Sequence, residues 1–152
     1  MKGKNSIGLI SLLGLILLMG ACNDDVYDEL PDGVAKFVSE YYPFSTVSSY
    51  SMNGDNYVVK MHNGATLVFD HNLSWIDFDG NGVTLPENFL YNCLPEPLYN
   101  YIQETQATSG IYRVTRDSEQ ITIYLEDTYF IYILSTGQIT YPSARDIAGL
   151  YF

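Results

Sequence analysis

The stretch "YVVKMHNGATLVFD", residues 57–70, places two short apolar runs on either side of an Asn-Gly pair. In the first run, Tyr57, Val59 and Met61 occupy alternate positions, the period that puts side chains on one face of a β-strand. Asn-Gly between two such runs is typical of a tight hairpin turn. The stretch therefore predicts an antiparallel hairpin whose second strand is Thr66–Phe69.

The same pattern returns 64 positions later, and the two copies align without a gap from Leu30 and from Leu94. Each copy opens with a helical pattern at positions i, i+3, i+4 and i+7 just after a proline, where helices often begin. The paired helix positions are Val34/Leu98, Phe37/Tyr101, Val38/Ile102 and Tyr41/Thr105, and the paired strand positions are Tyr57/Ile121, Val59/Ile123 and Met61/Leu125. The alternative is a chance offset in a strand-rich chain.

Each copy contains one helix followed by about four short strands. Beyond the hairpin, the strands that we expect are Trp75–Phe78, Tyr129–Leu134 and Gln138–Tyr141, and a further helix is expected over Pro86–Cys93. The sequence thus predicts an α+β fold of two tandem repeats, residues 30–79 and 85–141. Together they form a sheet of about eight antiparallel strands with the helices packed on one face. The pattern leaves open whether this is one continuous sheet or two smaller ones.

The N-terminus has the features of a secretory signal. Two lysines precede an uncharged run, Ile7–Met19, which is shorter than the roughly 20 apolar residues that span a bilayer. Small residues at 20–21 then precede Cys22. This spacing resembles the lipobox of bacterial lipoproteins, which implies cleavage of residues 1–21 and acylation of Cys22. The alternative is an ordinary signal peptide with a chance cysteine.

Acidic residues follow Cys22 at once, in "NDD" at residues 23–25. An acidic cluster at this place resembles the surface-export signal of lipoproteins from the Bacteroidetes, and a solvated tether is the alternative. We therefore expect an outer-membrane lipoprotein, facing either the cell surface or the periplasm. Residues 22–29 would form the lipidated tether, and residues 30–152 the folded domain.

Charge and cysteine content restrict the partners. The whole chain of 152 residues has a net charge of -11. Removal of Lys2 and Lys4 with the signal gives -11 - 2 = -13. Such acidity repels nucleic acid and anionic lipid headgroups, so we expect no nucleic-acid partner and membrane contact through the N-terminal lipid alone. Cys93 would be the sole free thiol, and its helical apolar setting predicts a small buried side chain.

Three stretches carry a family resemblance: "LPDGVAKFVSEYYP" from Leu30, "YVVKMHNGATLVFDHNLSWIDFDGNG" from Tyr57 and "LPENFLYNCLPEPLYNYI" from Leu85. Together they resemble the PepSY-like lipoproteins and periplasmic proteins of Bacteroidetes, over about residues 27–141. That family is similar in fold to the beta-lactamase inhibitor protein, which is built from two tandem αβ units. The resemblance implies a protein-binding or inhibitory role. The second copy departs from the pattern, since Asp127-Thr128 and Ile139 replace the Asn-Gly pair and Trp75.

The stretch "DFDGNG", residues 77–82, is the strongest metal-like signal. Asp77, Asp79 and Asn81 fit positions 1, 3 and 5 of a calcium loop, but position 12 is Asn88 instead of glutamate. Aspartate, glycine and asparagine are also the residues of a tight turn, which is the alternative and the favoured interpretation. The two histidines lie by separate turns with no histidine–carboxylate cluster at ligand spacing, so we expect no zinc site and no cofactor. No serine lies in a nucleophile elbow and the carboxylates are scattered, so we expect no catalytic residue.

The face of the sheet turned away from the helices is the candidate binding surface. If Tyr57, Val59 and Met61 face the helices, their neighbours face outward, and Trp75 is expected in the core. The residues proposed for this open face are Lys60, His62, Tyr112, Tyr124, Glu126 and Tyr132, together with Val58 and Thr122. An ordinary solvated sheet face is the alternative.

These patterns support a non-enzymatic envelope lipoprotein that binds an unidentified protein partner, with inhibition of a secreted or envelope hydrolase as the specific hypothesis. The alternative is a structural or accessory subunit of a surface complex, or a glycan-binding lipoprotein.

Overall fold

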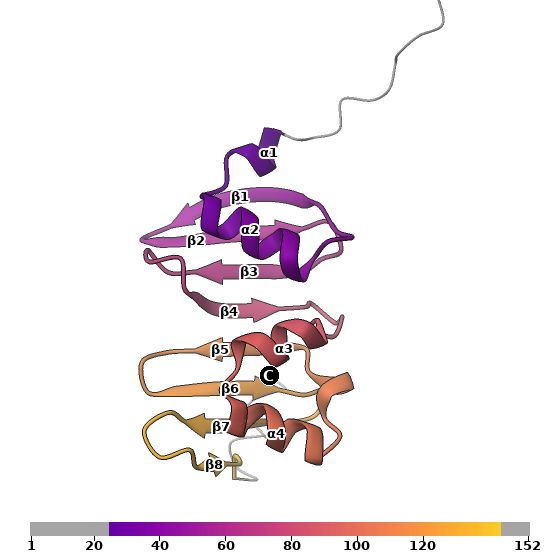
Figure 1. Cartoon of the computed structure of the whole chain (residues 1–152), viewed down its shortest axis with the longest axis vertical. Helices are drawn as coiled ribbons and strands as arrows, with labels where there is room; N and C mark the ends of the chain where they lie inside the picture. The colour runs from indigo at the N-terminus through magenta and orange to yellow at the C-terminus, as the bar shows by residue number, and fades with distance from the viewer. Residues whose placement is uncertain (1–24, 144–152) are drawn as a thin grey trace, which may run out of the picture.

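Eight antiparallel strands form one sheet, in which each strand pairs with its neighbours in the chain (Figure 1). The computed structural model describes residues 25–143. The strands are β1 Val47–Asn53, β2 Asn56–Met61, β3 Thr66–Phe69, β4 Trp75–Asp79, β5 Arg113–Arg116, β6 Gln120–Tyr124, β7 Tyr129–Ile133 and β8 Ile139–Thr140. The predicted hairpin is β2–β3, with Lys60 opposite Thr66. The sheet is therefore continuous, a point that the sequence pattern left open.

The helices cover one face of this sheet (Figure 1). They are α1 Asp25–Asp28, α2 Asp32–Tyr41, α3 Glu87–Cys93 and α4 Glu96–Glu104, with a short 3₁₀ turn η1 at Thr108–Gly110. Pro31, Pro86 and Pro95 precede α2, α3 and α4, and each has an extended backbone. Proline favours this position because its missing N–H costs no hydrogen bond there. The α+β class with helices on one face is confirmed.

Elements of the two halves recur at a spacing of about 64 residues; β1 and β5 start 113 - 47 = 66 residues apart, and β3 and β7 start 129 - 66 = 63 apart. The starts of α2 and α4 lie 96 - 32 = 64 residues apart, those of β2 and β6 lie 120 - 56 = 64 apart, and those of β4 and β8 lie 139 - 75 = 64 apart. Pairing of β4 with β5 joins the halves, with Asp77 opposite Thr115 and Asp79 opposite Arg113. The join makes the open face one surface.

An aromatic cluster fills the core between the helices and the middle of the sheet. Phe37 of α2 lies edge-on to Phe69 and Phe78, with ring centroids 5.3 and 5.1 Å apart. Phe89 of α3 packs against Phe78 at 4.8 Å and against Trp75 at 5.5 Å. Trp75 is 6% exposed, as expected for a core residue. The cluster links the first half of the chain to α3.

Register decides which strand residues face the helices. Val59, Met61, Ile121 and Ile123 are buried, as their alternation predicts. Residues directly opposite each other in a sheet share a face. Tyr132 lies opposite Ile121 and is 5% exposed, so our assignment of Tyr132 to the open face was wrong. Its strand is apolar at both parities, and for that reason alternation alone did not reveal its facing.

The folded part of the chain begins before residue 29, where the tether is expected to end. Residues 25–28 form α1, and Val26 and Tyr27 pack against the core. The Tyr27 hydroxyl donates a hydrogen bond of 2.6 Å to the carbonyl oxygen of Ala35, which fixes α1 to α2. Cys22 and the predicted signal lie outside the described residues. Within residues 25–143, no helix has the length and apolar character needed to cross a membrane.

Candidate functional site: the open sheet face

An ion pair lies at the middle of the open face, where the two halves of the chain meet. Asp77 and Asp79 alternate along β4, so both carboxylates project from the same face. The Arg113 guanidinium donates two hydrogen bonds to Asp77, from Nε to Oδ1 at 2.9 Å and from Nη2 to Oδ2 at 2.6 Å. Arg113 Nε lies 3.9 Å from Asp79 Oδ2. This bidentate geometry fixes the orientation of the guanidinium.

Aromatic side chains extend this ion pair across two further strands. The Arg113 guanidinium lies 5.4 Å from the ring centroid of Tyr124 on β6, within cation–π range. The Tyr124 ring is 5.8 Å from that of Tyr129 on β7. Hydrogen bonding to Asp77 raises the pKa of Arg113, so the guanidinium stays charged. We call Asp77, Arg113, Tyr124 and Tyr129 the central ladder.

Small and apolar side chains surround the central ladder. Their strand positions match the open parity, and most of them are half-buried; they are Val58, Thr66, Val68, Thr115, Thr122, Ile131 and Ile133. Thr122 is 7% exposed, so it supports the face from within and offers little contact area, contrary to our expectation. Tyrosine and arginine are enriched among the residues that dominate binding at protein interfaces, whereas valine and threonine are not, so the central ladder is the part of this face that best fits an interface.

The structure does not gather the six predicted binding residues into one site. Lys60 is exposed on β2, and His62 is exposed in the turn after it. Tyr124 lies on β6, four strand steps from β2 and hence roughly 19 Å away. Tyr112 and Glu126 share a separate hollow of about 320 Å³ with Gly82 and Leu125. Tyr132 faces the helices.

Sequence reasoning missed the central ladder. A signal for half of it is present, because Asp77 and Asp79 alternate as strand residues do, but the same two residues also fit positions of a calcium loop. The partner Arg113 depends on the pairing of β4 with β5. That pairing joins segments more than 30 residues apart, and no local pattern encodes it.

Asp77 and Asp79 belong to strand β4, and a turn follows at Asn81 and Gly82. The Asn81 backbone N–H donates to Asp79 Oδ1 at 2.7 Å, and the Asn81 amide donates to Thr66 Oγ1 at 3.2 Å. A Cβ on Gly80 would lie 1.8 Å from the carbonyl oxygen of Val83, so this position requires glycine. Asp77 is engaged by Arg113. Among residues 25–143, no group of three or more His, Cys, Asp or Glu side chains could hold a metal ion.

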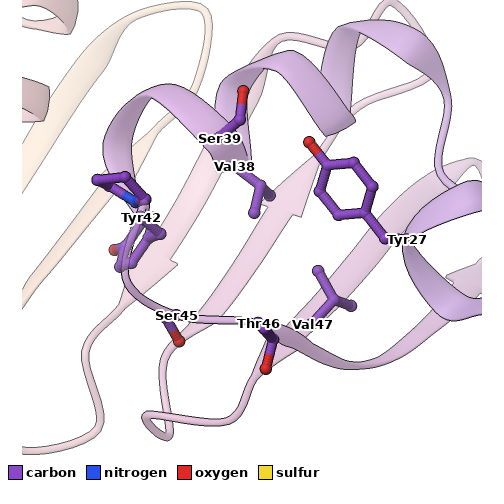
Figure 2. A pocket seen from close by; sticks show the side chains of 8 residues that line it. Tyr27, Val38, Ser39, Tyr42, Ser45, Thr46 and Val47 are labelled. Atoms are coloured by element: carbon purple, nitrogen blue, oxygen red, sulfur yellow. The ribbon is translucent and has the colours of Figure 1, made fainter. Parts of the chain in front are cut away.

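A hollow of about 290 Å³ lies between α1, the end of α2 and the start of β1 (Figure 2). Tyr27, Val38 and Val47 contribute apolar surface. The hydroxyls of Tyr42 and Ser45 are buried and have no hydrogen-bond partner within residues 25–143. Burial also raises the pKa of Tyr42. Tyr42 lines a second hollow as well, with Asn63 and Thr84 among others.

Cys93 has the properties of a structural thiol. Its Sγ donates a weak hydrogen bond to the Tyr41 hydroxyl at 3.4 Å. Burial raises the pKa of the thiol, which disfavours the reactive thiolate. Cys93 is therefore a packing residue between α3 and α2.

The comparisons with known proteins identify the family. The family model described as "Putative beta-lactamase-inhibitor-like, PepSY-like" matches residues 24–77 and 55–140. This chain belongs to that family. The two matches of the PepSY-like model overlap and together span every strand of the sheet. No functionally curated protein matches this PepSY-like chain in sequence.

Solved structures of similar fold come from Bacteroides. A "putative periplasmic protein" of Bacteroides vulgatus has a TM-score of 0.64 at 18% identity, over 75% of this chain and 90% of its own. A "putative calcium-regulated periplasmic protein" of Bacteroides thetaiotaomicron has a TM-score of 0.64 at 19% identity, over 75% and 92%. A second Bacteroides vulgatus protein has a TM-score of 0.60 at 16% identity, over 74% and 93%. These likenesses establish a shared fold.

Proposed function

We propose that this PepSY-like chain is a non-enzymatic, lipid-anchored protein of the cell envelope that binds another protein through its open sheet face. The central ladder is the observation that carries the proposal. It presents an oriented guanidinium and two tyrosine rings on a rigid sheet, which lowers the entropy cost of binding. The envelope location draws support from the periplasmic relatives and from the signal-like N-terminus.

The partner that we propose is a secreted or envelope hydrolase whose activity the chain restrains. The family description supports this choice, because it names likeness to a beta-lactamase inhibitor. Charge also restricts the partner. The chain has a net charge of -11, so it associates fastest with a protein whose contact surface is basic. Inhibition requires contact area and a fixed orientation, and it requires no catalytic group on this chain.

The test is a cross-linking pull-down from intact cells, followed by an activity assay of each recovered hydrolase. The bait is the full chain, and the variant is Tyr124→Ala with Tyr129→Ala. Phe44→Ala is the matched control, since Phe44 is a fully exposed ring in the loop before β1. We expect a hydrolase that is recovered with the original chain and the control, is lost with the double variant, and is slowed by the purified chain.

Two outcomes would contradict parts of this proposal. Recovery of the same partners by the double variant would show that they do not bind through the open face. A partner that is lost with the variant but keeps its full activity beside the purified chain would leave binding intact and exclude inhibition.

A further inference from the structure

A second surface on the molecule has the composition of a ligand site, and it lies in the helix layer. Tyr91 on α3 is 65% exposed, although it is a large aromatic side chain. It borders a hollow of about 280 Å³ lined by Tyr91, Leu94, Glu96, Tyr99, Asn100 and Gln103. This volume is just below the roughly 300–1,000 Å³ of drug-sized ligand pockets, so it suits a single ring.

The aromatic part of the hollow is held in place from below. Tyr99 is 7% exposed, and its ring lies edge-on to that of Tyr91 with centroids 5.2 Å apart. Gln103 Nε2 donates to the Tyr99 hydroxyl at 2.8 Å, and that hydroxyl lies 3.5 Å from Glu87 Oε1. Leu94 is buried between α3 and α4. These contacts fix Tyr99, which in turn supports the exposed Tyr91 ring.

The polar part of the hollow is free to bind. Within residues 25–143, the side chains of Asn100 and Glu96 have no hydrogen-bond or ion-pair partner, and both residues are exposed. An amide offers donors and an acceptor, and a carboxylate offers acceptors alone. Together they match adjacent hydroxyl groups, which both donate and accept.

We propose that this hollow binds a neutral pyranose ring of a glycan. The apolar C–H face of such a ring would pack on Tyr91, while its hydroxyls would bond to Asn100 and Glu96. An aromatic platform beside an amide and a carboxylate combines the apolar and polar surfaces that one sugar ring presents. The hollow lies on the helix side of the sheet, opposite the open face, so this site is independent of the proposed protein-binding surface.

The test is a nuclear magnetic resonance titration of the isotope-labelled full chain with methyl β-D-glucopyranoside and methyl β-D-galactopyranoside. Glycerol at equal concentration controls for hydroxyl effects without a ring, and tetramethylammonium chloride tests a cation in the same aromatic hollow. We expect saturable shifts at residues 87–103 with a millimolar dissociation constant for at least one glycoside, and none for glycerol.

Variants of Tyr91 distinguish a loss of ring contact with the glycoside from a loss of the fold. Tyr91→Ala should weaken the glycoside at least tenfold, roughly the factor that 1.4 kcal/mol represents, whereas Tyr91→Phe should keep the affinity within about threefold. Phe44→Ala, which removes an exposed ring elsewhere, should leave it unchanged. The proposal is overturned if neither glycoside gives saturable shifts, if Tyr91→Ala binds as well as the original chain, or if tetramethylammonium alone saturates the hollow. Unchanged resonances of Trp75 would verify that each variant remains folded.

Discussion

At the scale of single residues, the orientation of Arg113 on the open face depends on its pair with Asp77, and two buried hydroxyls, those of Tyr42 and Ser45, have no hydrogen-bond partner within residues 25–143. The pair is partly exposed, with Arg113 at 41% and Asp77 at 29% side-chain exposure, so solvent weakens its Coulomb attraction. Its two parallel hydrogen bonds strengthen the pair relative to an ordinary exposed ion pair. Of the two hydroxyl-bearing residues, Tyr42 is the more buried, and a buried hydroxyl with no partner among the described residues costs free energy in the folded state.

A double-mutant cycle measures the ion pair. Asp77→Asn and Arg113→Gln, singly and together, should give a coupling of about 0.5–1 kcal/mol in the free energy of unfolding by urea denaturation. The coupling should shrink in high salt because mobile ions screen partly exposed charges. Lys60→Gln, combined with Asp77→Asn, is the matched control on the same face and should show no coupling. A coupling near zero for the Asp77–Arg113 cycle would mean that the pair does not orient the ladder.

Removal of the Tyr42 hydroxyl should stabilise the protein. Tyr42→Phe is expected to raise the free energy of unfolding by about 1 kcal/mol at neutral pH, because the buried hydroxyl loses its contacts with water and gains none. Tyr41→Phe is the control and should give no gain, since its hydroxyl accepts a hydrogen bond from Cys93. A loss of stability in Tyr42→Phe would show that the hydroxyl has a partner.

The same variant should alter the response to alkaline pH. Burial raises the pKa of Tyr42 above the ordinary tyrosine value of about 10, so the folded state holds this proton more tightly than the unfolded state. Below about pH 10 the raised pKa of Tyr42 therefore leaves the free energy of unfolding unchanged. As the pH rises above about 10, the unfolded chain releases this proton first, and the free energy of unfolding falls. Urea denaturation at neutral pH and at about pH 11 should show a smaller alkaline loss for Tyr42→Phe than for the original chain. Equal alkaline losses of stability in the two proteins would mean that Tyr42 does not have a raised pKa in the folded state.

At the scale of elements, sequence periodicity was informative wherever one face of an element is polar. The limits of β3 were predicted to the residue, and those of β4 and α3 to within one. Alternation failed for β7, whose two faces are both apolar, and there the register with β6 decided that Phe130 and Tyr132 face inward. Helix α1 was missed because four residues give no readable period. The central ladder could not be predicted because it depends on the pairing of β4 with β5, a tertiary contact that local sequence patterns do not encode.

Helix α3 should anchor the aromatic cluster. Phe89 is fully buried and packs on Trp75, Phe78 and Phe37, so Phe89→Ala should cost about 3–5 kcal/mol in the free energy of unfolding. Tyr91→Ala, two positions along the same helix but exposed, should change it by no more than about 0.5 kcal/mol. Thermal and urea denaturation measure both. Equal effects of the two changes would place the centre of the core elsewhere.

At the scale of the whole molecule, two similar halves share one sheet and one core. The β4–β5 pairing and the contacts of Phe89 with Phe37 and Phe78 cross between them. Neither half should then be stable alone, and the chain should unfold in one step. Trp75 fluorescence reports the junction, and far-ultraviolet circular dichroism reports the whole fold. The two signals should give the same midpoint in urea, and separate midpoints would mean that the halves unfold independently.

A single continuous sheet also gives the molecule two distinct surfaces, an open strand face and a helix layer. We propose that a partner protein binds the open face. The most direct test places a photo-crosslinking amino acid at Tyr129 or Lys60 on that face, or at Asn100 in the helix layer, in intact cells. We expect the same protein adduct from Tyr129 and from Lys60, and no such adduct from Asn100. An adduct formed from Asn100 alone would show that the partner binds the helix layer instead of the open face.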